Sequence, residues 1–317
     1  MRNRMTCLII LLLTSAQVIA QTPDELIAVR NAYAKAMDDH DLDKMLSYWV
    51  DDGIYDHVQA PPPGIGKAAI RAGFEGIFAR QPDFHTTEGI VLATGNIVVV
   101  SHDSVGTFIQ NGNTVIGPHL DIYEFEGYKI KKTTTYGDAA GFMIQIGMMP
   151  APDVPPLVPS ITVPDAEPTG LAPMEANMDH INRWNSRDAA LMAKIYSDDV
   201  KIFAGPMGMT VDRVAMTAMN EMYFSAFPDI ELEVVRAIDL GNGWVVTELI
   251  SHGTHQGPFM GTPAMGYPTK LRAVWLTRYD ANGLLIEGSF YYDNMTLMTQ
   301  MTTAPYPLDG IWISTIP

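Results

Sequence analysis

Residues 136–146 read YGDAAGFMIQI, and residues 291–301 read YYDNMTLMTQM. The two stretches share tyrosine, aspartate, methionine and glutamine in one register, so that Asp138 matches Asp293. Each stretch ends a strand-like run and then becomes helix-like, with the aspartate at the change. Because the phrase occurs twice at a long separation, it indicates a duplicated domain.

The segments before the two phrases follow one plan. Each opens with two helical patterns separated by an aspartate, Asp41 or Asp188, which fits the N-cap of the second helix. A short strand comes next, and a third helical pattern ends at Pro82 or Pro228 because proline cannot donate to the helical ladder. Three or four strands follow, with hairpin turns such as 281–283. This order predicts an α+β fold in which helices pack on one face of a curved antiparallel sheet.

A proline-rich stretch separates the two copies. Residues 148–173 carry eight prolines, a composition typical of an extended, semi-rigid linker. An irregular insertion in a single domain is the alternative, and the repeated plan on both sides disfavours it. We therefore expect a first domain at 21–147, a linker at 148–173, a second domain at 174–302 and a C-terminal tail at 303–317.

Residues 1–20 have the layout of a secretory signal peptide. Arg2 and Arg4 precede the apolar run CLIILLL, and small residues lead to Ala20, where we expect cleavage. A membrane anchor is the alternative, and the shortness of the apolar run disfavours it. The prediction is a secreted or periplasmic protein. Cleavage would remove Cys7, the only cysteine, so the mature chain would have no disulfide, thiol nucleophile or thiolate ligand.

The charge balance limits the partners. The 317 residues carry a formal net charge of −16, and removal of the two leader arginines makes it −18. An acidic surface repels phosphate backbones and anionic lipids. We therefore expect no nucleic-acid partner and no membrane partner, and we expect a hydrophobic small molecule as the ligand.

Two stretches resemble a known family. Residues 253–293, GTHQGPFMGTPAMGYPTKLRAVWLTRYDANGLLIEGSFYYD, resemble the hairpin signature of SnoaL-like proteins, the polyketide cyclases and ester cyclases of the nuclear transport factor 2-like superfamily. Residues 55–84, YDHVQAPPPGIGKAAIRAGFEGIFARQPDF, are similar to the family's first half. The resemblance covers most of 30–147 and 175–300, so the chain resembles a tandem SnoaL-like protein.

The resemblance implies two cone-shaped α+β barrels, each with an apolar cavity, and no metal or organic cofactor. In the cyclases of this family, the aspartate of the closing strand acts as general acid and base. It removes a proton next to a carbonyl, and the carbanion closes a ring by intramolecular aldol attack. By position, this aspartate corresponds to Asp138 and Asp293.

Each copy departs from the family pattern in a different place. The first copy has Phe108 where the second has His255. The second copy has Phe203-Ala204 where the first has Asp56-His57. Neither copy therefore carries the whole pattern.

Candidate site residues follow from these positions. The predicted catalytic residues are Asp293, Asp138, His255 and His57, and the predicted substrate-binding residues are Tyr291, Tyr136, Trp275, Tyr279, Phe259 and Glu124. Burial in an apolar cavity would raise the pKa of a catalytic carboxylate. Strand alternation places each tyrosine of the repeated phrase on the same face as its aspartate. The alternatives are that each aspartate is a helix N-cap and that His255 is a hydrogen-bonded surface histidine.

The strands of the first copy are rich in polar residues. His57, His85, His102, His119, Asp121 and Glu124 all fall on or beside predicted strands. They could line a polar cavity, or form a mononuclear metal site of the histidine–carboxylate type. His252 and His255 are poor joint ligands because strand residues three apart point to opposite faces. We predict no metal.

Three functions of different class fit the sequence. The first is a cofactor-free enzyme of cyclase, isomerase or dehydratase type that enolises a carbonyl compound. The second is an exported protein that binds an apolar small molecule without changing it, and the third is a structural or interaction module with relic cavities. We expect the domains to pack as an internal pseudo-dimer, with a homo-oligomer left open.

Overall fold

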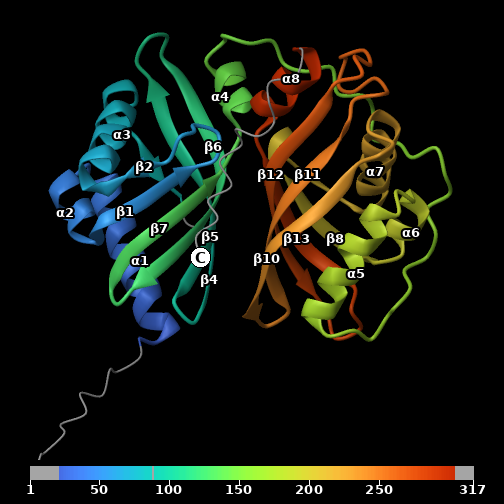
Figure 1. Cartoon of the computed structure of the whole chain (residues 1–317), viewed down its shortest axis with the longest axis horizontal. Coiled ribbons are helices and arrows are strands. Elements are labelled where there is room, and N and C mark those ends of the chain that lie inside the picture. Colours follow the sequence, from blue (N-terminus) through green and yellow to red (C-terminus); the bar gives the residue numbers. More distant parts are fainter. Residues whose placement is uncertain (1–20, 88, 304–317) are drawn as a thin grey trace, which may run out of the picture.

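The computed structural model describes residues 21–87 and 89–303, and the predicted signal peptide lies outside them. Two α+β domains stand side by side with their sheets facing each other, and most of the helices cover the outer faces (Figure 1). The predicted internal pseudo-dimer is therefore the arrangement of the chain. No helix of the described part is both long and apolar enough to cross a membrane.

The two domains repeat one order of elements. The first contains α1 (Pro23–Asp38), α2 (Leu42–Ser47), β1 (Trp49–His57), β2 (Gly64–Ile65), α3 (Gly66–Arg80), β3 (His85–Thr86), β4 (Ile90–Thr94), β5 (Ile97–Phe108), β6 (Asn113–Glu126), β7 (Lys129–Tyr136) and α4 (Ala139–Gln145). The second contains α5 (Pro173–Asn185), α6 (Ala189–Ala193), β8 (Tyr196–Ala204), the 3₁₀ turn η1 (Gly205–Met207), β9 (Met209–Val211), α7 (Arg213–Ala226), β10 (Glu231–Gly241), β11 (Trp244–Thr254), β12 (Pro268–Tyr279), β13 (Leu285–Tyr292) and α8 (Asn294–Thr302).

Each sheet is open rather than closed into a barrel. The first has the order β2-β1-β7-β6-β5-β3, with β4 also paired to β5, and the second has the order β10-β11-β12-β13-β8-β9. The sequence predicted antiparallel sheets, and each sheet has one parallel pair, β1 with β7 and β8 with β13. The parallel pair arises because the chain leaves the first strand for the third helix and the middle strands. The last strand then lies beside the first and runs in the same direction.

Local signals set the helix boundaries. Thr22 and Glu25 form a capping box at the start of α1, and the side chains of Asp41 and Asp188 accept amide hydrogen bonds at the starts of α2 and α6. The N-caps predicted for Asp41 and Asp188 are therefore confirmed. Each domain then has its own core between sheet and helices, with Trp49 buried in the first and Tyr196 in the second.

A third apolar cluster joins the two domains. Leu120 and Ile122 of β6 meet Val246 of β11 and Val274 and Leu276 of β12, and all five side chains are fully buried or nearly so. The outward face of each sheet is thus covered by the other sheet instead of by water. Removal of this apolar surface from solvent favours a fixed pairing of the domains.

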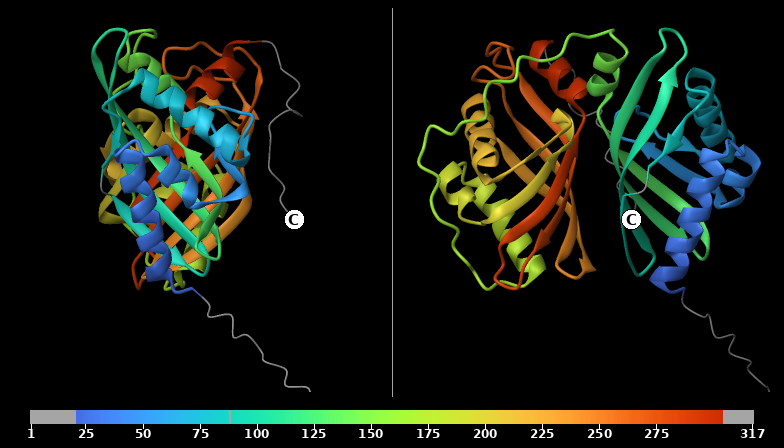
Figure 2. Two further views of the ribbon diagram at one scale, coloured as in Figure 1. Left: turned by 90° about the vertical axis from the view of Figure 1, so that its left-hand side faces the viewer. Right: turned by 180° about the vertical axis from the view of Figure 1, so that it is seen from behind.

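The linker runs along the outer side of the second domain (Figure 2). Ser160 donates from its amide and hydroxyl to Glu221 of α7, at 2.7 and 2.6 Å. Farther on, the amide of Glu167 donates to the carbonyl of Lys194, and that of Thr169 to the carbonyl of Asn282. These contacts attach the linker to one domain, so it acts as part of that domain's surface.

Candidate functional site

The first domain encloses a cavity of about 380 Å³ between its sheet and the helices α1 and α3. Phe74 and Ile77 of α3 and the neighbouring Phe84 give it apolar walls. Tyr33 of α1 and Tyr55 of β1 bring phenol groups, and the sheet side is polar. Burial raises the pKa of both phenols, so they keep their protons and serve as hydrogen-bond donors.

A histidine–aspartate pair lies on the sheet side of this cavity. Nε2 of His102 on β5 is 2.9 Å from Oδ2 of Asp121 on β6, and the hydroxyl of Tyr123 donates to the same oxygen at 3.0 Å. Burial alone would raise the pKa of Asp121, but its hydrogen bond with His102 and the nearby histidines hold the pKa well below its usual range. An ionised carboxylate only accepts, so Nε2 carries the proton. In the neutral ring Nδ1 then carries the lone pair, and this atom is buried without a hydrogen-bond partner among the described residues.

Two further histidines complete the polar wall. The ring of His119 lies 6.0 Å from that of His102 and 6.3 Å from that of His57, measured between centroids. Burial lowers the pKa of His119 to about 4 and also lowers that of His57, so both are neutral at pH 7. A Cβ atom at Gly137 would lie 2.7 Å from the His119 ring, so this position has to be glycine for the ring to lie against the closing strand.

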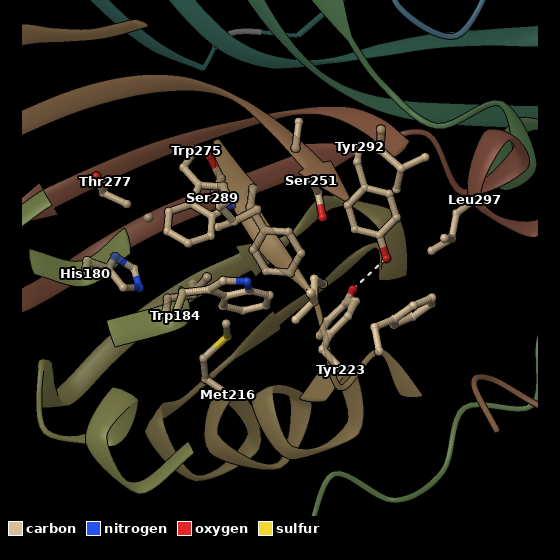
Figure 3. A pocket seen from close by; sticks show the side chains of 18 of the residues that line it. His180, Trp184, Met216, Tyr223, Ser251, Trp275, Thr277, Ser289, Tyr292 and Leu297 are labelled. Carbon is tan, nitrogen blue, oxygen red and sulfur yellow. Dashed lines mark hydrogen bonds between the residues drawn. The ribbon is translucent and has the colours of Figure 1, made fainter. Parts of the chain in front are cut away.

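The second domain has a smaller and more apolar cavity of about 70 Å³ (Figure 3). Trp184 and Trp275 fill it, with ring centroids 5.8 Å apart, and the hydroxyls of Tyr223 and Tyr292 share a hydrogen bond of 2.6 Å. Burial lowers the pKa of His180 to about 3, so it is neutral. This cavity leaves room for a few atoms only.

One position explains the difference between the cavities. On β6, Leu120 pairs with Tyr136 and is followed by Asp121. On β12, Val274 pairs with Tyr291 and is followed by Trp275. The duplicated register thus places an acid in the first cavity where the second has a large indole. The two domains share a fold but no longer a site.

The repeated aspartates do not lie free in their own cavities. Oδ1 of Asp138 accepts from the amides of Ala140 and Asn294, at 3.1 and 2.9 Å, and Oδ2 from Gly141 at 3.0 Å. Asp138 therefore caps α4 and reaches the start of α8 in the other domain. Burial, followed by the charge of Asp293, raises the pKa of Asp138 to about 6.

Asp293 caps α8 and reaches the start of α4 in the same way. Its Oδ2 accepts from the amide and hydroxyl of Thr296 in α8, at 3.0 and 2.6 Å, and its Oδ1 accepts from the amide of Ala139 at 2.9 Å. Each aspartate therefore bridges the N-termini of both closing helices. Asp138 also borders the first-domain cavity, whereas the second-domain cavity is lined without Asp293.

The structure places three predicted substrate-binding residues between the domains. The hydroxyl of Tyr136 donates to Oε1 of Glu248 at 2.8 Å, and that of Tyr291 shares a 3.0 Å hydrogen bond with Ser101. Oε1 of Glu124 pairs with Arg236 at 2.8 Å. Tyr136 and Tyr291 thus point to the opposite domain and lie away from the carboxylates that alternation was expected to give them.

Other predicted residues belong to the second-domain core. Phe259 and His255 are fully buried, and the ring of Phe227 lies beside both. His255 is therefore not a surface histidine, and burial lowers its pKa. Neither of its ring nitrogens makes a hydrogen bond of good geometry within the described residues. The hydroxyl of Tyr279 meets Nδ1 of His180 at 3.1 Å, whereas Trp275 lines the cavity.

Of the predicted catalytic residues, only His57 and Asp138 border the first-domain cavity. The structure adds His102, His119 and Asp121, which the sequence showed as polar strand residues without their mutual geometry. Their signal was the concentration of histidine and acid on strands otherwise built for a core. No three or more His, Cys, Asp or Glu side chains gather in a way that could hold a metal ion within 21–87 and 89–303.

The fold and the cavity define a class of protein: α+β domains with a curved sheet that shelters a small-molecule site. Residues 176–301 match the SnoaL-like polyketide cyclase family, and residues 29–133 match the SnoaL-like domain family. The chain therefore belongs to the SnoaL-like proteins and carries two such domains in tandem. No curated protein sequence shows a significant match to it.

Solved structures similar to the chain each match one domain's length of it. AclR from Streptomyces galilaeus is 23% identical over 42% of this chain and 83% of its own, with a TM-score of 0.38. IdmH from Streptomyces antibioticus is 23% identical over 42% of this chain and 100% of its own, with a TM-score of 0.37. An NTF2-like protein from Burkholderia xenovorans LB400 is 15% identical over 39% of this chain and 97% of its own, with a TM-score of 0.35.

Proposed function

We propose that the first domain is a cofactor-free acid–base enzyme that enolises a neutral, hydrophobic carbonyl compound. The SnoaL-like fold supports small-molecule binding or cyclase-type chemistry in general. The observation that carries the finer proposal is the free Nδ1 of His102, buried on a cavity wall with Asp121 behind its Nε2. The second domain, with its filled cavity, serves as a scaffold.

The proposed step breaks a C–H bond next to the carbonyl. Nδ1 of His102 takes the proton, the C–H electron pair forms the enolate, and the negative charge moves to the carbonyl oxygen. Ionised Asp121 stabilises the resulting imidazolium, and the phenol groups of Tyr33 and Tyr55 supply donors for the oxygen. Return of the proton to another carbon gives an isomer, whereas attack of the enolate on a second carbonyl of the same molecule closes a ring.

Binding without chemistry is the second candidate. The two aspartates that the family resemblance marks as acid and base are occupied as helix caps, and Asp138 accepts four hydrogen bonds. A carboxylate with its lone pairs engaged in this way is a poor base. On this alternative the cavity holds a ligand and His102 only orients it.

Hydrogen exchange separates the two candidates. Acetophenone is incubated with the protein in D₂O, and deuterium entry next to its carbonyl is followed by NMR, while calorimetry measures binding. An enzyme accelerates exchange, and His102→Gln or Asp121→Asn lowers the acceleration about 100-fold or more. The control His85→Gln changes an exposed histidine outside the cavity and keeps the wild-type rate. Binding without accelerated exchange in the wild type would leave only the second candidate.

We also propose that the protein acts outside the cytoplasm. The support is the leader-like sequence of residues 1–20. Mass spectrometry of the protein from fractionated cells tests this. A mature N-terminus at Gln21 in the extracytoplasmic fraction is expected, and an intact leader in the cytoplasm would contradict the proposal.

A further inference from the structure

We infer that the cavity between the two domains is a second compartment of the same binding site and receives an apolar chain of the substrate. This inference rests on the proposed function of the first domain, since it assigns the shape of that domain's substrate. The compartment has a volume of about 620 Å³, larger than the first-domain cavity. Its walls come from α4, α8, η1, the hairpin that contains Phe259 and the first part of the linker.

The two compartments share a wall. Gly117 of β6 and Asp138 and Phe142 at the start of α4 line both of them. A Cβ atom at Gly117 would lie 3.0 Å from both the His119 ring and the Ser104 hydroxyl, so glycine lets this part of the shared wall stay thin. The inference is that a molecule whose carbonyl lies beside His102 extends past this glycine toward the domain interface.

The chemistry of the second compartment selects an uncharged hydrocarbon chain. Phe203, Met207 and Met298 supply apolar surface, and the flexible thioethers adapt to different shapes. One polar side chain of its wall is already engaged, since the Gln145 amide bonds the backbone of Ile116 in both directions. This amide makes no demand on a ligand.

Charge excludes one class of ligand from this compartment. The carboxylates of Asp103 and Asp138 lie in its wall, and the compartment has no basic side chain among its lining residues. An anionic tail would meet like charge at low dielectric. The substrate is therefore a neutral carbonyl compound with an alkyl or polyketide-like chain, and a free carboxylate or phosphate at the chain end is disfavoured.

A series of phenyl ketones tests the inference. Acetophenone can bind within the first compartment, and butyrophenone, hexanophenone and octanophenone add methylenes that extend toward the second. Calorimetry should show Kd falling up to about fourfold per added methylene, from the transfer free energy of a CH₂ group. Equal Kd values along the series in the wild type would overturn the inference.

Substitutions in the compartment wall test where the alkyl chain of the ketone lies. Met298→Trp on α8 narrows the second compartment, so the ratio of the acetophenone and octanophenone Kd values should fall toward one. Val154→Trp does the same from the exposed linker and guards against misfolding of the helix variant. The matched control Met295→Trp lies on the same helix outside the compartment and should keep the wild-type ratio.

The proposed function and this inference fail differently. Ile77→Trp narrows the first compartment and should weaken binding of every ketone. If the wild type binds no ketone at all, the proposed function is wrong. If ketones bind with a chain-length effect that Met298→Trp and Val154→Trp both leave intact, the first domain holds a site but the second compartment is not part of it.

Discussion

His119, which lines the first-domain cavity, makes the free energy of unfolding depend on pH. The folded pKa of His119 is about 4, below its ordinary value of 6.5, because burial disfavours the imidazolium. As pH falls, the unfolded chain therefore takes up this proton before the folded chain does. The contribution of His119 to stability is complete above pH 6.5 and is lost as pH falls toward 4.

We expect His119→Gln to flatten this dependence. Between pH 6.5 and 4, the difference in unfolding free energy between the wild type and the variant should shrink by about 2 kcal/mol. Asp138, whose pKa is raised to about 6, acts in the opposite sense over the same range, but it is present in both proteins and cancels. Urea unfolding at a series of pH values measures the difference. A difference that is independent of pH would contradict the buried, neutral state of His119.

A buried ion pair at the domain interface gives a second residue-scale prediction. The carboxylate of Asp56 receives two hydrogen bonds from Arg272, at 3.0 and 2.8 Å, and both side chains are largely buried. Asp56→Ala leaves the guanidinium without its partner and should destabilise the protein by about 3 to 5 kcal/mol in urea unfolding. Asp39→Ala, which breaks an exposed pair with Lys35, is the control and should leave the midpoint unchanged.

The same pair shows where residue-level prediction ends. Lys270, Arg272 and Arg278 alternate with apolar residues along β12, a pattern typical of a strand with one face in water, but Arg272 faces the other domain and pairs with Asp56. A single sequence shows that two faces of a strand differ, and it does not show which surface later covers the polar face. Likewise, the contact of His102 with Asp121 depends on strand register, which no local pattern fixes.

At the scale of elements, the closing helices α4 and α8 are joined through their N-caps, Asp138 and Asp293. They lie side by side at one end of the interface (Figure 1), and Asp138 and Asp293 each cap one helix and reach the other's first amides. Helix N-termini favour anionic caps, and here one carboxylate serves two N-termini. The repeated stretches 136–146 and 291–301 therefore lie at the point where the two copies meet.

Loss of either cap should cost more than loss of an ordinary one. Asp293→Ala and Asp138→Ala each remove hydrogen bonds to two helices, and we expect each to lower the unfolding free energy by about 2 to 3 kcal/mol. Asp188→Ala, which removes a cap that serves α6 alone, should cost about 1 kcal/mol. Chemical denaturation of the three variants measures the difference. Equal costs would mean that the cross-domain hydrogen bonds add nothing.

Element order was predictable because its signals are local. Caps such as Asp41, helix-ending prolines and Gly-containing turns depend on neighbours a few residues away, and the duplicated α+β plan follows from them. The openness of the sheets and the parallel pairing of β1 with β7 depend on how distant segments return to each other. The relation between the domains is of the same kind, since nothing local distinguishes an apolar strand face in a core from one in an interface.

At the scale of the whole molecule, the sheet-to-sheet cluster makes the two domains one stable body. The outward face of each sheet carries an apolar patch that the other sheet covers, so a separated domain would expose this hydrophobic patch. The contacts of Asp138 and Asp293 with both closing helices and the Asp56–Arg272 pair also join the two domains. We therefore expect the full chain to unfold in a single calorimetric transition.

A charge placed in the cluster should uncouple the domains. Ile122 of β6 is fully buried against the second domain and lies outside the core of its own. In Ile122→Glu the carboxylate can regain water only if the sheets part, because burial of an unpaired charge costs several kcal/mol. Each domain keeps its own helix-covered core, so scanning calorimetry should resolve two transitions in place of one. Val235→Glu, at a half-exposed position on β10, is the control and should keep one transition. A single transition in Ile122→Glu at a lower temperature would mean that the cluster belongs to the core of the first domain and that the domains fold as one unit through other contacts.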